Sequence, residues 1–442
     1  MTDLWNQLPE ATRAAIVARG TASWRHVYDG VATHNKEWRP LRPPIMSVRT
    51  YDSLTEISAT VARLILAACR RRAATAGELR RALGLPVGYI DLLDEDLPLT
   101  DELIGGVRAD ILFGGGAPYV VEANIDSALG GAHDSDGVAA RFLAAYAGDA
   151  ALDELGLTAP ASAVDARYEA VRSALQLTGD DRLVMVFTTA GSYPGSQDGL
   201  ALIKLLEPFS ARGRELGLDM RVYPVEWLTL DDSGGLCVDD GPVDAVLRMF
   251  VPQGTKPSEG LDALHAAVRS GTVRMFTATA SWLLASKQIF AWLWADLTLM
   301  EAADARIIRQ HVPQTDLLTA DLRDRVLADR EHLVLKPNGN YGGVGVVVGP
   351  EVDAAAWTAA VDAAVQEGGY VVQRHVDVDR LTMQFVRMAT GEVEQADVPF
   401  CIAPYLFGGT PAGAYLRFTV PGAGPVVNVG QGALTSGLLL LP

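Results

Sequence analysis

Four polar residues in the largely apolar stretch 105–131 have the types and spacing needed to bind a metal ion and phosphate. Glu122 and Asn124 lie two residues apart, and strand residues at i and i+2 point to the same face. Arg108 and Asp110 have the same spacing, before a Gly-rich turn. Carboxylate and amide oxygens suit Mg²⁺ bridged to phosphates, as at the catalytic centre of an ATP-using enzyme. The alternative is a surface hairpin whose acidic residues face solvent.

A second motif, EHLVLKPNGNYGGVGVVVGP at residues 331–350, predicts two strands joined by a flexible turn. Four glycines lie between Asn338 and Gly345. Backbone N–H groups of such a turn can close over phosphate oxygens because no Cβ obstructs them. Lys336, directly before the turn, could reach the same phosphates. The alternative is a simple tight turn, and the segment lacks the G-K-[ST] ending of a Walker A loop.

Three further residues could act on the same phosphates. Lys287 lies in SWLLASKQIFAWLWADL, residues 281–297, which predicts a buried helix; a lysine there usually extends its charge to solvent, but it could instead reach a phosphate. Arg417 lies mid-strand and could offset charge on a phosphoryl group, or form a surface ion pair. Gln373 is expected to be exposed on a strand, residues 370–381, whose backbone could bind an adenine edge.

The remaining elements must position these groups. Residues 1–100 predict mostly helices, and helices return between residues 137 and 180. Residues 181–280 alternate strand, helix and strand, which predicts a small open α/β unit. A loop follows its first strand, at the edge where such sheets bind ligands, so we expect it to contact substrate. This loop lacks the G-x-G-x-x-G spacing of a dinucleotide site.

Composition limits the function classes. The chain has 442 residues, 49% apolar and 21% charged, which is ordinary for a globular protein of several domains. A net charge of −17 argues against nucleic acid as a partner. Cys69, Cys237 and Cys401 are too far apart in the sequence for a zinc cluster or disulfide framework, so reduced thiols in a cytoplasm are expected. No apolar run predicts a signal peptide or membrane span.

In their order along the chain, these motifs resemble those of the circularly permuted ATP-grasp ligases of the glutathionylspermidine synthetase type. The resemblance covers residues from about 100 to 437, and the metal-binding strands precede the lysines, as in the permuted group. The matching segments are Arg108-Ala109-Asp110 (R-x-D strand), Glu122-Ala123-Asn124-Ile125-Asp126 (E-x-N-x-D strand), Ser286-Lys287 (first lysine), Leu335-Lys336-Pro337 (second lysine and flap) and Val372-Gln373 (adenine hinge).

The resemblance implies an α/β fold with α+β elements: a permuted ATP-grasp core, an open α/β domain of the pre-ATP-grasp kind and a helical N-terminal region. The expected divisions are residues 1–100 (helical N-terminal region), 101–180 (metal-binding strands plus helices), 181–280 (open α/β substrate domain) and 281–442 (nucleotide-binding subdomains with the Gly-rich flap).

The resemblance also implies the cofactors, ATP and Mg²⁺, and roles for the site residues. The metal ligands would be Asp110, Glu122 and Asn124, and the catalytic cations Arg108 and Arg417. The ATP-binding residues would be Lys287, Lys336, Asn338, Gly339, Tyr341, Gly342, Gly343, Gln373 and Val376. Candidates for substrate contact, chosen because they lie on expected loops or strand ends, are Asp126, Ser127, His133, Ser192, Tyr193, Gln197 and Arg248.

The sequence departs from the family after the E-x-N-x-D strand. The usual T-P is replaced by Ser127-Ala128, and no amidase domain is expected. The expected reaction joins a small-molecule carboxylate to an amine through an acyl phosphate, in a biosynthetic pathway. Two alternatives stay open: loading of an amino acid onto a carrier-protein thiol, and an inactive nucleotide-binding scaffold. No nucleic-acid or membrane partner is expected, and a homodimer is an open alternative.

Overall fold

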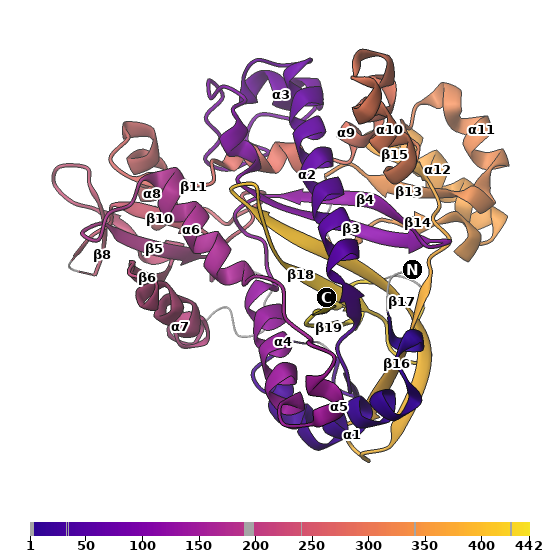
Figure 1. Ribbon diagram of the computed structural model, residues 1–442. Helices are drawn as coiled ribbons and strands as arrows, with labels where there is room; N and C mark the ends of the chain where they lie inside the picture. Colours follow the sequence, from indigo (N-terminus) through magenta and orange to yellow (C-terminus); the bar gives the residue numbers. More distant parts are fainter. Residues whose placement is uncertain are drawn as a thin grey trace.

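The computed structural model describes residues 4–31, 33, 35–189, 199–239, 241–339, 342–424 and 427–442. At its centre lies a seven-stranded antiparallel sheet (Figure 1). Its long strand β17 pairs with β16 through its first half and lies between β3 and β18 through its second half. The strands are β1 (Trp38–Pro40), β3 (Gly106–Gly114), β4 (Ala117–Ile125), β16 (Arg380–Arg387), β17 (Val393–Phe407), β18 (Thr410–Phe418) and β19 (Leu434–Ser436).

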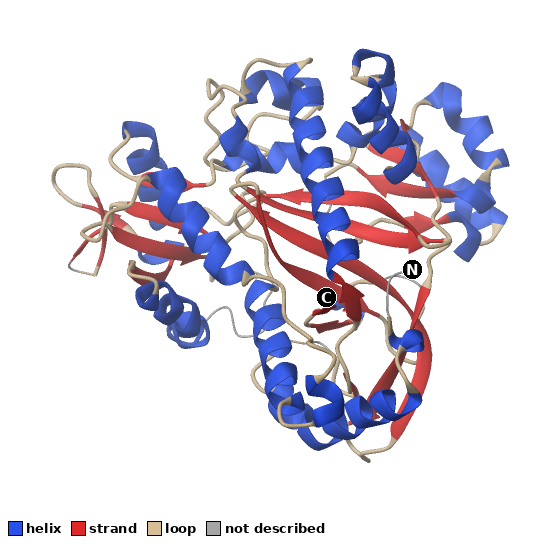
Figure 2. Cartoon of the chain, viewed as in Figure 1, coloured by secondary structure: helices blue, strands red, loops and turns tan. Residues whose placement is uncertain are grey.

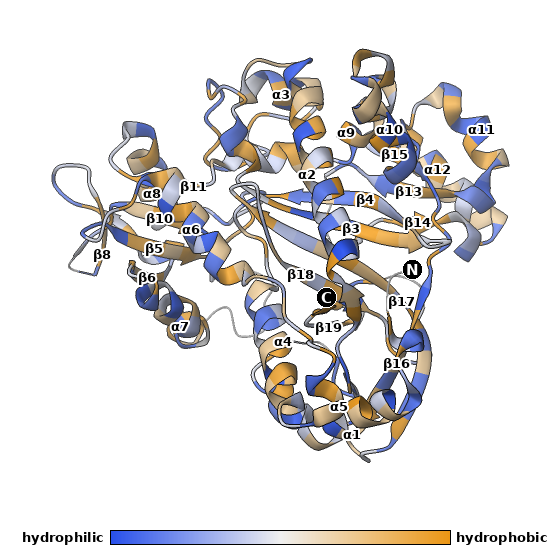
Figure 3. Ribbon diagram, viewed as in Figure 1, coloured by the Kyte–Doolittle hydropathy of each residue, from blue (hydrophilic) through white to orange (hydrophobic). Residues whose placement is uncertain are grey.

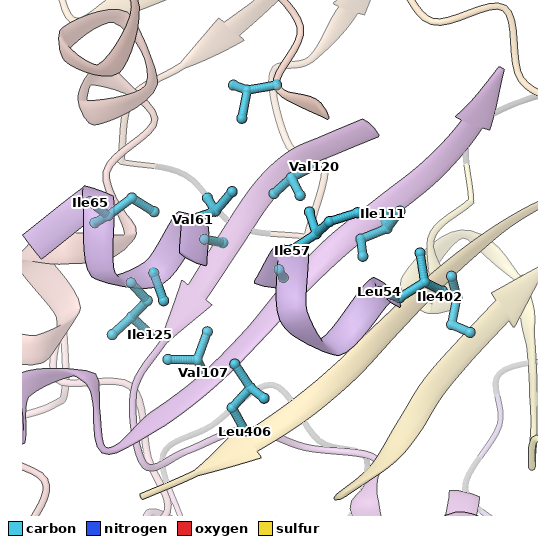
Figure 4. Packing of buried hydrophobic residues seen from close by; sticks show 14 of the residues in the cluster. Leu54, Ile57, Val61, Ile65, Val107, Ile111, Val120, Ile125, Ile402 and Leu406 are labelled. Atoms are coloured by element: carbon cyan, nitrogen blue, oxygen red, sulfur yellow. The ribbon is translucent and has the colours of Figure 1, made fainter. Parts of the chain in front are cut away.

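Helix α2 (Val48–Arg70) crosses one face of this sheet (Figure 1). It begins at Ser47, whose hydroxyl accepts a hydrogen bond from the Thr50 amide at 3.1 Å, an ordinary N-cap. Its buried residues recur at helical spacing and pack on the apolar side chains of β3, β4 and β17, as Figure 4 shows. This helix therefore covers one face of β3 and β4 and leaves the other face for polar side chains.

A second, four-stranded antiparallel sheet carries the Gly-rich motif. Its strand order is β12 (Thr315–Leu317), β15 (Tyr370–Arg374), β13 (Leu333–Pro337) and β14 (Val347–Val348). Helices α11 (Arg323–Ala328) and α12 (Ala354–Glu367) share its core, where Trp357 and Val361 pack on Leu335 and Val372.

A third sheet, of four parallel strands, has the order β11 (Arg274–Phe276), β10 (Ala245–Arg248), β5 (Arg182–Phe187) and β6 (Asp219–Pro224). Helices α6 (Ala163–Leu175), α7 (Gly199–Glu215) and α8 (Glu259–Ser270) pack around it. This is the open α/β arrangement that residues 181–280 predict. A small ribbon extends from it, formed by β7 (Thr229–Leu230), β8 (Leu236–Val238) and β9 (Gly241–Pro242).

Figure 2 marks the two ends of the chain near the middle of the view. Close to the C-terminus, β2 (Ile45–Ser47) pairs in parallel with β20 (Leu439–Leu441). Apolar residues of α1 and α4 pack on this pair. The remaining helices are α1 (Glu10–Val27), α3 (Ala76–Ala82), α4 (Ala132–Tyr146), α5 (Ala150–Asp153), α9 (Gln288–Ala295) and α10 (Ala302–His311), and 3₁₀ turns connect several elements.

Hydrophobic residues lie along the strands and the inner sides of the helices (Figure 3). Among the residues described, no helix combines the length and apolar character needed to cross a bilayer. The cysteines are unpaired, with Cys69 and Cys401 buried and Cys237 partly buried.

We predict that packing of α2 on the sheet is a main source of stability. Leu54 is 1% exposed, whereas Leu299 is 67% exposed and serves as a matched control. Leu54→Ala should lower the free energy of unfolding by about 2–5 kcal/mol because it leaves a cavity. Leu299→Ala should change it by less than about 0.5 kcal/mol. Urea unfolding followed by circular dichroism measures both, and equal effects would contradict this view of the core.

Candidate functional site

Strands β3 and β4 bring the four polar residues of the predicted metal-binding strands onto one face of the central sheet. The antiparallel register pairs Arg108 with Asn124 and Asp110 with Glu122. The apolar residues that alternate with them face α2 instead (Figure 4). The four side chains therefore form two adjacent cross-strand pairs on the face that α2 leaves uncovered.

A bulge interrupts this pairing beside the polar residues. Asp110 is opposite Glu122, but the next residue, Ile111, is opposite Val120, so Val121 is the extra residue of β4. The Val121 carbonyl oxygen accepts a hydrogen bond from Lys336 Nζ at 3.2 Å. The bulge thus connects β4 to the second sheet.

Arg417 forms a buried ion pair with Asp110, at 2.8 Å between Nη2 and Oδ2. The alternative of a surface ion pair is therefore wrong, since Asp110 is 8% exposed and Arg417 9% exposed. Small residues of β17 make room for the arginine: Cys401 is opposite it, with Sγ 3.2 Å from Nη2, and Ala403 follows on the same face. Burial favours the neutral form of Arg417 and so lowers its pKa. The adjacent Asp110 carboxylate has the opposite effect, and the net result is a raised pKa for Arg417.

Arg108 lies beside this pair. Its Nη1 donates to the Gly130 carbonyl oxygen at 2.8 Å, and its guanidinium lies 4.8 Å from the centre of the Tyr415 ring. Its Nε has no hydrogen-bond partner among the described residues, although it is buried, and the same holds for Arg417 Nε. Two guanidinium N–H groups are therefore available at the site.

Lys287 reaches Glu122 instead of solvent, with Nζ 3.1 Å from Oε1 and only 5% of the residue exposed. The predicted single helix over residues 281–297 is wrong. The segment forms a 3₁₀ helix, η4 (Thr279–Ala285), then α9, and Lys287 lies at the junction. Its backbone amide donates to the Asn338 carbonyl oxygen at 3.2 Å, which joins the two lysine segments.

Lys336 is buried where the second sheet meets the central sheet. Its Nζ donates to Gln373 Oε1 at 2.6 Å, and Gln373 Nε2 donates to Thr315 Oγ1 at 3.0 Å. Burial lowers the pKa of Lys336 to about 8, partly offset by the Glu122 carboxylate. The expectation that Gln373 is exposed is wrong, because it is 3% exposed and its side chain positions Lys336.

The Gly-rich turn begins at Asn338 and Gly339, beside Lys287. Gly342 and Gly343 have φ values of +70° and +74°, which side chains with a Cβ rarely adopt. Tyr341 lies outside the described residues. Val376 is partly buried and contacts the end of the β3–β4 hairpin, where its Cγ1 would lie 2.9 Å from a Cβ on Gly114.

The donor set of these strands fits a divalent cation. Asp110 and Glu122 supply carboxylates, while Asn124 donates its Nδ2 to the Arg108 carbonyl at 3.2 Å and leaves its amide oxygen available. No group of three or more His, Cys, Asp or Glu able to hold a metal occurs in the described part of the chain. A cation here would therefore need oxygen ligands from a phosphate as well.

The substrate candidates separate into three groups. Asp126 and Arg248 form a buried ion pair at 2.8 Å that links the end of β4 to the end of β10. Ser127 is buried, and its hydroxyl has no hydrogen-bond partner among the described residues. His133 packs against Phe209, with 4.5 Å between ring centres. Ser192, Tyr193 and Gln197 lie outside the described residues.

A cavity lies beside β4 and is lined in part by residues that the sequence motifs did not indicate. It is narrow, with a volume of about 30 Å³, and it opens to solvent. Its lining residues are Leu85, Tyr89, Glu122, Asn124, Trp282, Leu283, Ala285, Ser286, Lys287, Asn338 and Gly339. Tyr89 and Trp282 were missed because they belong to no recognisable spacing, and only the folded chain brings them to this wall.

Comparisons with known proteins agree with the sequence resemblance. Residues 255–373 match a family described as a circularly permuted ATP-grasp. No curated protein sequence matches the chain. A glutathione synthetase-like effector from Globodera pallida, solved in its apo form, shares the fold with a TM-score of 0.56, at 11% identity over 97% of each chain.

Two further solved structures are more distant. A candidate gamma-glutamylcysteine synthetase from Methylobacillus flagellatus has a TM-score of 0.45 at 13% identity over 87% of each chain. D-alanyl-alanine synthetase A from Vibrio cholerae has a TM-score of 0.31 at 12% identity, over 60% of this chain and 90% of that one.

The matched segment, residues 255–373, contains both predicted phosphate lysines and Gln373. The predicted family resemblance and fold class are thus confirmed. Residues 255–373 match the circularly permuted ATP-grasp family, and the chain as a whole has a mixed α/β fold of that type.

Proposed function

We propose that this protein is an ATP-dependent carboxylate–amine ligase that joins two small molecules through an acyl phosphate and releases ADP and phosphate. The family match supports the ATP-dependent ligase class. The observation that carries the proposal is a charge cluster built from five separate segments. Asp110 and Glu122 meet Lys287, Lys336, Arg108 and Arg417 on one face of the sheet.

The cluster has the charge balance that a triphosphate needs. Four cations and two carboxylates leave an excess of positive charge, although the chain as a whole carries −17. In the free protein Lys287 pairs with Glu122 and Arg417 with Asp110. Asp110, Glu122 and Asn124 would hold Mg²⁺, which when bound neutralises phosphate charge and orients the transferred group.

The chain's own residues bind and orient both reactants. Lys287, Lys336 and the backbone amides of the Gly-rich turn hold the phosphates of ATP. An oxygen of the substrate carboxylate attacks the γ-phosphorus, and the bond to the β–γ bridging oxygen breaks, which releases ADP. Arg417 and Arg108 have guanidinium N–H groups available to stabilise the negative charge on the transferred phosphoryl group.

In the second step the nucleophile attacks the acyl carbon, and phosphate leaves. Asn338 favours an amine as this nucleophile. It lines the cavity, and its buried Oδ1 has no donor among the described residues, so it can accept an N–H. A thiol is a weaker donor for that oxygen, which makes loading of a carrier-protein thiol the second candidate. The Gly-rich turn excludes water, because acyl phosphates hydrolyse.

An inactive nucleotide-binding scaffold is the third alternative. A phosphate-release screen of carboxylates, chiefly amino acids, paired with amines or carrier thiols, followed by product mass, distinguishes the three. We expect release of ADP and phosphate only when a carboxylate is present. The mass of the product should be that of an amide. ATP binding without ADP release under every pair tested would favour the scaffold. We further propose a cytoplasmic location, in keeping with the unpaired cysteines.

We predict that Asp110→Asn abolishes carboxylate-dependent ADP release, because it removes a metal ligand and the partner of Arg417. The fall should exceed about 10³-fold, the upper range for loss of one electrostatic contact in an active site. Circular dichroism should be unchanged, since the substitution is isosteric. Near-normal turnover in the folded variant would contradict the site.

Arg417→Ala should lower kcat by more than about 10²-fold, the scale expected when a charge stabiliser is removed. Arg417→Lys keeps a positive charge but loses the fork of N–H donors, so it should restore turnover only in part. Steady-state kinetics measure both variants. A mild effect of Arg417→Ala would assign this arginine a structural role.

Nucleotide affinity should fall as the pH rises through about 8, the pKa of Lys336 in the free protein. Only the ammonium form attracts phosphate, so above this pH binding requires proton uptake, and affinity falls by up to about tenfold per pH unit. Calorimetric titration with a non-hydrolysable ATP analogue between pH 6.5 and 9.5 measures the slope. Lys336→Met should bind the analogue more weakly, and its affinity should no longer depend on pH in this range. Lys36→Met, at an exposed position, should keep both the affinity and its pH dependence.

A further inference from the structure

The loop that follows α3 forms one wall of the cavity beside the metal-binding strands. It supplies Leu85 and Tyr89, which belong to the N-terminal helical region and to none of the ATP-grasp motifs. The loop lies close to the start of the Gly-rich turn, because a Cβ on Gly339 would lie 2.0 Å from the Tyr89 hydroxyl oxygen. A glycine at 339 therefore permits this approach.

Backbone and side-chain hydrogen bonds fix the position of this loop. The Asp91 amide donates to the Pro252 carbonyl oxygen at 2.7 Å, and Thr279 Oγ1 donates to the Leu92 carbonyl oxygen at 2.8 Å. The Thr255 amide donates to Asp91 Oδ2 at 3.0 Å. Tyr89 is thus held in place by contacts that do not involve its own hydroxyl.

A chain of three side chains fixes the direction in which that hydroxyl donates. Trp282 Nε1 lies 3.2 Å from Gln253 Oε1, and Gln253 Nε2 lies 2.9 Å from the Tyr89 hydroxyl. An indole N–H can only donate, so the oxygen of the Gln253 amide must face Trp282 and its NH₂ must face Tyr89. The Tyr89 oxygen is therefore an acceptor from Gln253, and no described residue accepts its own proton, which remains available to another partner.

The available proton belongs to a tyrosine that lines the cavity together with Glu122, Asn124, Lys287 and Asn338. Burial raises the pKa of Tyr89, so the hydroxyl keeps its proton at neutral pH. A neutral O–H next to cations and metal ligands is suited to an anionic oxygen, to which it donates a charge-assisted hydrogen bond.

We propose that Tyr89 binds the carboxylate substrate by donating a hydrogen bond to the carboxylate oxygen that does not attack the γ-phosphorus. This inference rests on the proposed ligase function. The hydroxyl orients the reacting group, and Gln253 and Trp282 position the hydroxyl. The N-terminal helical region thereby contributes directly to recognition of the carboxylate substrate.

The test compares two variants with the carboxylate and amine that the phosphate-release screen identifies. Tyr89→Phe removes only the hydroxyl. Gln253→Glu is isosteric, but a carboxylate only accepts, so the Tyr89 proton must turn toward it. Each variant should lower kcat/KM for the carboxylate by about 10- to 100-fold, the effect of one hydrogen bond to a charged group. The double variant should lose no more than either single variant, because both remove the same contact.

Two controls accompany these variants. Affinity for a non-hydrolysable ATP analogue, measured by calorimetry, should stay within about twofold in both. Tyr223→Phe removes a tyrosine hydroxyl bonded to Asp239, away from the site, and should leave kcat/KM unchanged.

Either of two results would overturn the proposal. One is a kcat/KM for the carboxylate within about twofold of wild type in Tyr89→Phe or Gln253→Glu, the size of ordinary non-specific effects. The other is an equal loss of ATP-analogue affinity, which would place Tyr89 on the nucleotide. Asp110→Asn separates these results from failure of the proposed function: if that variant keeps its turnover, the ligase site itself is wrong.

Discussion

The register between β3 and β4 is the constraint on which the site depends. With Asp110 opposite Glu122 and Arg108 opposite Asn124, all four side chains lie on the face that α2 leaves uncovered, where Glu122 and Asn124 line the cavity. A slip of one residue would turn them toward α2, since alternate strand residues point to opposite faces. The apolar residues between them prevent such a slip, because they complete the core with α2 (Figure 4). Packing on one face of the sheet therefore determines chemistry on the other.

The free protein holds its binding charges in pairs across several segments. Lys287 is paired with Glu122, and Arg417 is paired with Asp110. Lys336 is buried, and its hydrogen-bond acceptors among the described residues are neutral. Its pKa of about 8 lies below the ordinary 10.5, so its charge costs the folded state on the order of 3 kcal/mol at pH 7. That cost is fully present below pH 8 and disappears as the pH rises toward 10.5, where the unfolded chain also loses the proton. A bound phosphate would relieve this cost, because its negative charge would compensate the buried ammonium.

Local spacing was enough to predict the parts of the site that lie on single strands. The i, i+2 pairs at Arg108–Asp110 and Glu122–Asn124 and the lysine before the Gly-rich turn could be read from the sequence, and their order indicated the permuted family. The partners of these residues could not be predicted in this way, because they depend on contacts between segments that are distant in the sequence. Gln373 is buried and accepts a hydrogen bond from Lys336. Lys287 lies where a 3₁₀ helix meets α9, and Tyr89 reaches the cavity from the N-terminal region. The alternation of polar and apolar residues along one strand does not indicate which other part of the chain packs against that strand.

We propose that the two lysines and strands β3 and β4 hold the phosphates of one ATP molecule. A crystal structure with Mg²⁺ and a non-hydrolysable ATP analogue is the sharpest test. We predict phosphate oxygens within hydrogen-bond distance of Lys287 Nζ and Lys336 Nζ, and a magnesium ion on Asp110 and Glu122, with the Lys287–Glu122 contact of 3.1 Å replaced. A nucleotide bound elsewhere, with both ion pairs intact, would contradict it.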